Sequence, residues 1–215
     1  MGTTKLQLYN AALIEVGDRT LASETENVEA RRLLDSVYDA ALEECLSAGE
    51  WNFAVRPVQV DADTGISPNF GETEVFAKPS DWIRTFAVSG DENFAYPLTN
   101  YQDEPSRWVS NISPMYIKYV SNGVDYGLKL TAWPRAFTRY VELELAYRIC
   151  GRINQNRSMR EVIDRDRRRA KRQALNEDTM NEAQPKFFPS GSWTTARWGR
   201  GAGRQDRGSR NNLTG

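Results

Sequence analysis

The stretch NVEARRLLDSVYDAALEECLSAGEWNFAVRP, residues 27–57, changes its hydrophobic period part-way along. Its first part repeats apolar residues every three or four positions, as one face of a helix does. The members of this face are Leu34, Val37, Ala41 and Cys45. After Gly49 the apolar residues alternate with polar or small ones, which is typical of a half-buried strand. These alternating residues are Trp51, Phe53 and Val55. The stretch therefore predicts a long helix that runs into a strand.

The start of this helix is predicted by a capping box. Ser23 and Glu26 have the required spacing, in which a serine oxygen and a glutamate carboxylate satisfy free backbone N–H groups at a helix N-terminus. Acidic residues near this point suit the positive end of the helix dipole. They are Glu24, Glu26 and Glu29. Gly49 is expected to end the helix.

Three more helices are expected on either side of a different middle section. The first has apolar residues at helical spacing from Leu6 to Val16 and ends at Gly17. Another begins at Pro134, a residue favoured in a first turn. Its apolar positions are Phe137, Val141, Leu145 and Ile149. A second capping box, Ser158 with Glu161, opens a fourth helix that runs to about residue 182.

The middle section is rich in short β-prone runs separated by Pro, Gly, Asn and Asp. The predicted strands are 51–60, 73–78, 82–89, 115–121 and 127–131. Asn122-Gly123 lies between the last two, and this dipeptide favours the positive φ angles of a tight hairpin. We therefore expect a small antiparallel β domain here.

These elements predict an α+β fold. Residues 1–50 and 132–183 are expected to form a discontinuous helical bundle from both ends of the chain. Residues 51–131 would be an inserted small antiparallel β domain, and residues 184–215 an extended C-terminal tail without periodicity.

The fourth helix has an unusually thin apolar face for its length. That face contains Met159, Ile163, Ala170 and Ala174. The run RDRRRAKR, residues 165–172, crosses its centre. A helix this polar bridges solvent or packs against neighbouring copies. The predicted donors of salt bridges between subunits are Arg165, Arg168, Arg169 and Arg172. Contact with DNA phosphates is the alternative, but the interleaved Asp164 and Asp166 favour salt bridges.

Composition lowers the expectation of catalysis. The chain of 215 residues contains no histidine, which removes Ser-His and Cys-His nucleophile pairs and the usual zinc sites. Carboxylates adjacent on helices, Glu43 with Glu44 and Glu142 with Glu144, are interpreted as solvated surface groups. Cys45 and Cys150 are expected to be buried thiols. We expect no catalytic residues, no metal site, no cofactor and no membrane span; the chain is not expected to be an enzyme.

The charge of the chain is unevenly distributed. From residue 184 onward there are six basic residues and one acidic residue, a net charge of +5, whereas residues 1–183 carry −6. Within this tail, SWTTARWGRGAGRQDRGSR covers residues 192–210. Trp and Arg are the residues enriched in protein–protein anchors. Trp193, Arg197 and Trp198 are therefore predicted to bind a partner protein. Binding of RNA or single-stranded DNA by the Arg/Gly-rich tail is the alternative.

Several segments, in the same order and spacing, resemble a known family. LYNAALIEVGDRTL (8–21) resembles its opening helix and turn, and residues 27–57 resemble its long helix leading into a Trp-x-Phe-Ala segment. VFAKPSDWIRTFAV (75–88) is similar to its Pro-x-Asp turn, and SWTTAR (192–197) to its C-terminal Trp-x-x-x-Arg signature. The family is the head–tail adaptor of short-tailed bacteriophages, also called tail tubular protein A or gatekeeper protein. Lys78 stands where the family has an apolar residue, so we expect that strand end to be more exposed.

The resemblance implies a structural virion protein at the head–tail interface, assembled in the host cytoplasm. It implies a homo-oligomeric ring, expected to be twelve-fold, that joins the portal protein to the tail nozzle protein, with a tail fibre as a further contact. DNA would pass through the lumen without sequence-specific binding during genome retention and ejection. Trp193, Arg197 and Trp198 would then be the portal anchor.

Overall fold

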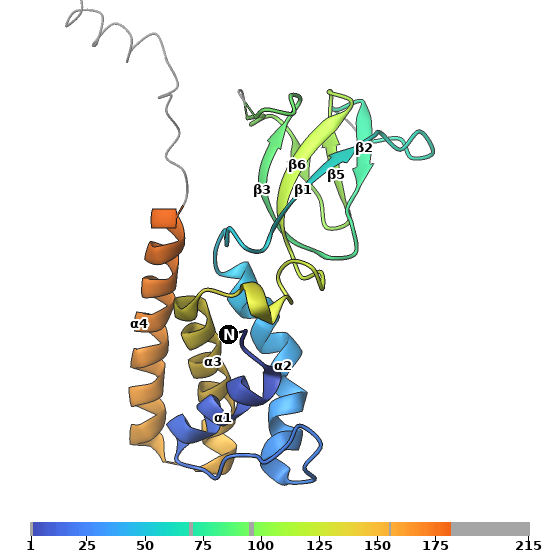
Figure 1. The fold of residues 1–215 in the computed structure, drawn as a ribbon. Helices are drawn as coiled ribbons and strands as arrows, with labels where there is room; N and C mark the ends of the chain where they lie inside the picture. The colour runs from blue at the N-terminus through green and yellow to red at the C-terminus, as the bar shows by residue number, and fades with distance from the viewer. Residues whose placement is uncertain (1, 69–70, 95–96, 155, 182–215) are drawn as a thin grey trace, which may run out of the picture. The chain divides into compact units, whose positions relative to one another are not determined.

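The protein is a mixed α+β chain (Figure 1). The structure is a computed structural model, and it describes residues 2–68, 71–94, 97–154 and 156–181. Within these ranges it contains four α-helices and two small antiparallel sheets of three strands each. The α+β class predicted from the sequence is confirmed.

The helices lie near the two ends of the described chain. They are α1 (Lys5–Val16), α2 (Glu29–Ser47), α3 (Arg135–Ile153) and α4 (Arg157–Asn181), with a short 3-10 helix η1 (Leu130–Ala132) before α3. The strands are β1 (Val55–Val60), β2 (Glu74–Ala77), β3 (Trp82–Ser89), β4 (Gln102–Asp103), β5 (Arg107–Ser110) and β6 (Met115–Ser121).

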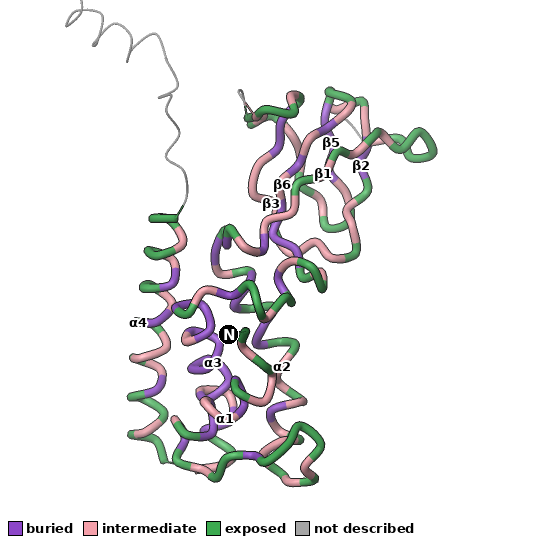
Figure 2. The backbone as a smooth tube through the Cα atoms, viewed as in Figure 1, coloured by how far each residue is buried: buried purple, intermediate pink, exposed green. Residues whose placement is uncertain are grey.

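Helix α3 is the centre of the helical part, because α1, α2 and α4 all pack against it. Figure 2 shows α3 as largely buried along its length. Its apolar residues occur around most of the helix circumference, as expected for a helix covered on several sides. The core that they form includes Leu8 and Leu13 of α1, Leu34 and Cys45 of α2, and Ile163 of α4.

The helix starts differ from those predicted. The Glu26 carboxylate accepts a hydrogen bond from the Ala22 backbone N–H at 2.8 Å and forms an ion pair with Arg19. Ser23 and Glu26 therefore lie in a turn and do not form the predicted capping box. Helix α2 begins only at Glu29, with Val28 as its N-cap, five residues after the predicted N-cap Ser23. At α4 the Asn156 Oδ1 atom accepts from the Ser158 and Met159 backbone N–H groups. Asn156 therefore caps α4 in place of Ser158.

The predicted strand at residues 51–60 begins only at Val55, because Trp51 belongs to the helical core. Its Nε1 atom donates to the Cys45 carbonyl at 2.9 Å, and its ring meets the Phe137 ring edge-on at 4.8 Å between centroids. Residues 52–54 form a turn. Burial of Trp51 at the end of the long helix, at 1% exposure, is as predicted. Phe53 is only partly buried.

The strands form two antiparallel sheets, in the orders β1-β6-β3 and β2-β5-β4. The predicted strand at 127–131 is wrong, since a turn ends at residue 128 and η1 begins at Leu130. Gly123 does not adopt a positive φ, and the Asn122 backbone N–H donates to the Asp81 carbonyl at 3.0 Å instead of closing a hairpin. Strands β4 and β5 were not predicted; both are four residues or shorter.

Lys78 follows β2, whose last residue Ala77 is exposed, but the Lys78 side chain itself is buried. Its side chain is 4% exposed, its Nζ atom lies 3.4 Å from the Trp82 ring centroid, and it forms an ion pair with Asp103. The Lys78 Nζ atom also lies 5.4 Å from the centroid of the Trp108 ring. Cation–π contact and ion pairing together compensate the cost of burying the charge.

Strand β6 contributes to both cores of the described chain. Met115, Ile117 and Tyr119 alternate into the core between the strands, whereas Val120 packs with the helical core. This alternation follows from the period of two along a strand.

Candidate functional site

Helix α4 is the element on which the sequence placed its candidate interface, and its inner face attaches it to α3. Of its 25 residues only Ile163, Ala170 and Ala174 are buried. These positions, with Arg167, recur every three or four residues and so lie along one face. The apolar part of this face is as thin as the sequence predicted.

Arg167 supplies the polar part of the attachment. Its Nη1 atom donates to Glu144 Oε2 of α3 at 2.7 Å, and its Nη2 atom donates to Asp164 at 2.8 Å. Its guanidinium also lies over the Tyr147 ring at 4.5 Å. Burial alone would lower the pKa of Arg167, but the hydrogen bonds to Glu144 and Asp164 raise it above its ordinary value. Arg167 is thus a structural cation.

Glu144 is almost fully buried, with 2% of its side chain exposed. It accepts hydrogen bonds from Arg167 and from Arg148 Nε at 2.8 Å. Glu142 is similarly buried and forms ion pairs with Arg135 and Arg139. The interpretation of Glu142 and Glu144 as solvated surface groups was therefore wrong. Arginines supplied by α3 and α4 themselves occupy both carboxylates.

The outer face of α4 carries the four predicted arginines. Arg165, Arg168, Arg169 and Arg172 are all exposed. Their spacing of i, i+3, i+4 and i+7 puts them on one face, and at 100° per residue that face is opposite Ile163, Ala170 and Ala174. We call these four residues the arginine stripe. It points away from α3.

Among the described residues, two members of the arginine stripe have acidic partners, and both acids are on α4 itself. Arg168 pairs with Asp164 at 2.6 Å, and Arg165 lies 3.6 Å from Asp166. Arg169 and Arg172 form no ion pair with any residue that the structure describes. Like charges at i, i+4 repel on a helix. The stripe is thus a positive surface that the described residues neutralise only in part.

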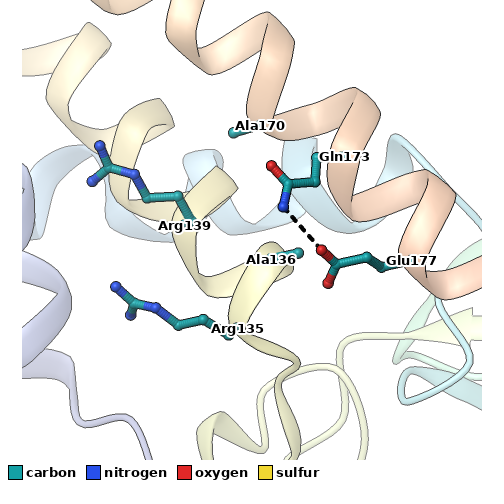
Figure 3. A pocket seen from close by; sticks show the side chains of 6 residues that line it. All are labelled: Arg135, Ala136, Arg139, Ala170, Gln173 and Glu177. Atoms are coloured by element: carbon teal, nitrogen blue, oxygen red, sulfur yellow. Dashed lines mark hydrogen bonds between the residues drawn. The ribbon is translucent and has the colours of Figure 1, made fainter.

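A hollow of about 190 Å³ lies between α3 and α4 (Figure 3). Ala136 and Ala170 face it, and Gln173 donates to Glu177 at 2.9 Å along its edge. Figure 3 shows the side chains of Arg135 and Arg139 turned away from α4. The hollow is smaller than the ~300–1,000 Å³ of typical small-molecule pockets.

The thiols of Cys45 and Cys150 are buried and free, as predicted. Burial raises the pKa of both, which keeps them protonated. Among the described residues no three His, Cys, Asp or Glu side chains are grouped so that they could hold a metal ion. No described helix combines the length and apolar character needed to cross a bilayer.

The predicted partner anchor lies outside the described residues. Trp193, Arg197 and Trp198 belong to residues 182–215, so their role stays a prediction from the sequence. On α4 the sequence did find the exposed arginines, but it missed the role of Arg167. Its sequence spacing could have indicated this role, because Ile163, Arg167, Ala170 and Ala174 follow one another at intervals of three or four residues.

Comparison of the chain with models of known protein families and with curated protein sequences gave no match.

Proposed function

We propose that this chain is a subunit of a head–tail adaptor ring of a short-tailed bacteriophage. The subunit would consist of a discontinuous helical bundle, residues 1–50 and 132–183, with the β section 51–131 inserted in it. The ring would join the portal to the tail nozzle and enclose the path of the DNA. The proposal begins from the ordered sequence resemblance across residues 8–57, 75–88 and 192–197.

The structural observation that supports it most is the outer face of α4. A helix of 25 residues with three buried positions gains little from apolar burial. Its opposite face carries four exposed arginines, two of which form no ion pair with any described residue. Such a surface suits a subunit whose neighbour supplies the missing acids, as in a closed ring where each copy contacts two others.

The charge of residues 1–183 agrees with a DNA conduit. Their net charge is −6. A negative wall repels the phosphate backbone, which lets DNA slide without being held. Residues 184–215, with a net charge of +5, would instead bind the portal through Trp193, Arg197 and Trp198.

Electron microscopy of negatively stained protein, imaged alone and after mixing with portal, tests the proposal. We expect rings with a central channel on the portal. A chain that ends after Pro185 should keep its helical circular dichroism and lose portal binding, because it lacks both tryptophan anchors. Trp193→Ala with Trp198→Ala should bind nearly as poorly, whereas Arg207→Ala with Arg210→Ala serves as the matched control and should bind normally. Normal portal binding by the shortened chain would contradict the anchor role.

Nucleic-acid binding is the second candidate, and the exposed arginine stripe is the observation that favours it. Binding through phosphates falls steeply with salt. Fluorescence anisotropy with single- and double-stranded DNA between 50 and 200 mM salt separates the candidates. Tight binding that weakens by a large factor supports a nucleic-acid protein, and negligible binding supports the adaptor.

A further inference from the structure

We propose that the arginine stripe of α4 binds an acidic pair on α2 of a second copy of this chain. The acidic pair is Asp39 and Glu43. This inference rests on the proposed function, because it names the surface that a ring subunit would present to its neighbour. It makes the contact heterologous, with α4 of one copy against α2 of the next.

The acidic pair is exposed and carries negative charge that is available to a partner. Asp39 and Glu43 are exposed, and neither forms an ion pair with a described residue. The adjacent Glu44 differs, because it is tied to Arg148 of α3. At a spacing of i, i+4 the two free carboxylates repel each other on one helix face. Placing cations opposite them removes this repulsion.

A single copy cannot join the two surfaces. Both α2 and α4 pack on α3, and Figure 1 shows them on opposite sides of it. Asp39 and Glu43 lie opposite the buried Leu34, Ala41 and Cys45 on the α2 circumference, although the buried Leu46 is on their side of the helix. The acidic pair therefore points away from α3, as the arginine stripe does. Only a different molecule can bring the two together.

The directions of the helices suit a ring contact. Helix α2 runs antiparallel to α3, since Arg148 pairs with Glu44 and Arg152 with Glu29. Helix α4 is also antiparallel to α3, since Glu144 pairs with Arg167 while residues 135 and 177 line one hollow. Helices α2 and α4 therefore run in the same direction. Rotation about an axis along the helices preserves that direction between neighbouring copies.

The charges also match in register. Gly49 lies against Leu175 so closely that a Cβ atom on the glycine would be 2.5 Å from the leucine Cδ2, which shows which positions of α2 and α4 are level. Gly49 lies two residues beyond the end of α2, and within α2 the Glu44 Oε1 atom lies 4.0 Å from Arg167 Nη1 of α4. The two contacts together place Asp39 and Glu43 level with residues 162–169 of α4, which include Arg165, Arg168 and Arg169. A closed ring has no rise between copies, so level positions meet. Both acids then face arginines.

Reversing the charges on each side tests the contact. One variant carries Asp39→Lys with Glu43→Lys, and the other carries Arg165→Glu, Arg169→Glu and Arg172→Glu. Arg168 is left unchanged because it holds Asp164 within α4. Each variant alone places like charges face to face, so its association should be on the order of tenfold or more weaker than that of the wild type. In an equal mixture, both kinds of contact have opposite charges again.

Light scattering at low salt measures the assembly, and circular dichroism verifies that each variant is folded. We expect wild-type assemblies, weak association of each variant alone, and mixed assemblies that contain equal amounts of both. The control is Glu92→Lys with Asp125→Lys, which makes the same charge change as the α2 variant at exposed positions outside α2 and α4. It should assemble as the wild type does.

Three results overturn this contact. They are assembly of either variant alone at wild-type strength, failure of the mixture to recover, and a wild-type chain that stays monomeric at every concentration. None of these decides the proposed function, because imaging on the portal tests that separately. Absence of rings on the portal would instead overturn the function.

Discussion

Arg167 and Arg168 are adjacent in sequence and have opposite roles on α4. Arg167 is turned inward, with 19% of its side chain exposed, and bonds the buried Glu144 of α3. Arg168 is turned outward, with 72% of its side chain exposed, and reaches only Asp164 of its own helix. A rotation of 100° per residue separates the two. The position of an arginine around the helix thus decides whether it stabilises the fold or remains available to a partner.

The largest change in the free energy of unfolding is expected from a substitution at the inner face of α4, where it packs on α3. Glu144→Ala removes the buried acceptor of Arg148 and Arg167, whose guanidiniums keep only Glu44 and Asp164. Loss of one partner of a buried ion pair costs about 3 kcal/mol or more of the free energy of unfolding. Urea denaturation followed by circular dichroism measures this change. Glu43→Ala on exposed α2 is the control, at less than about 0.5 kcal/mol. A loss below about 1 kcal/mol for Glu144→Ala would contradict the inner role.

A smaller effect should come from removing both partners together. Arg167→Met keeps the bulk of the stem, and Glu144→Gln removes the buried charge. The double variant should lose about 1–2 kcal/mol less than the sum of the two single losses, because neither partner is left as an unpaired charge. A double-mutant cycle by urea denaturation gives this value. Additive losses would show that the two groups do not interact.

Stability at low pH tests the contribution of Asp164, which lies between the inner and outer faces of α4. Hydrogen bonding from Arg167, and then from Arg168, lowers the pKa of Asp164 in the folded protein. A lowered pKa gives stability that is fully present above the unfolded value of about 3.9 and is lost as the pH falls through the folded pKa. Below about pH 4, the wild type should therefore lose stability more steeply than Asp164→Asn. Urea midpoints at several pH values measure both slopes, and equal slopes would refute the prediction.

The smallest effect is expected at the outer face. Arg172→Ala removes a charge that repels Arg168 one turn earlier and has no acidic partner among the described residues. The free energy of unfolding should change by less than about 0.5 kcal/mol, towards greater stability. Thermal unfolding of the separated chains measures it. A loss above about 1 kcal/mol would place Arg172 in a contact within its own chain.

The sequence predicted the helices well because their apolar spacing depends on the helix itself. The same spacing selected the exposed Arg165, Arg168, Arg169 and Arg172, although it did not identify Arg167 as the link to α3. The errors occurred where distant residues decide the structure. Trp51 alternates as a strand residue does, but the Cys45 carbonyl and the Phe137 ring draw it into the helical core.

Capping residues and charged residues were harder to place. Ser23 with Glu26 has the right spacing for a helix start, yet Glu26 is engaged by Ala22 and Arg19. Glu144 was expected to be exposed because charged residues usually are, and the strand end at Lys78 because the resembled family has an apolar residue there. Each is buried because its partners come from elsewhere in the fold: Asp103 and two tryptophans for Lys78, and arginines of two helices for Glu144.

The central position of α3 has a consequence for folding during translation. Glu15 of α1 pairs with Arg139 of α3, which the ribosome adds 124 residues later. At a synthesis rate of ~5–20 residues per second, α3 is completed on the order of ten seconds after α1 and α2, which it covers in the folded protein. By then all six strands that the structure describes have been synthesised, since β6 ends at Ser121. The β section can therefore fold first, and the apolar faces of α1 and α2 are the surfaces of the nascent chain that a chaperone would protect.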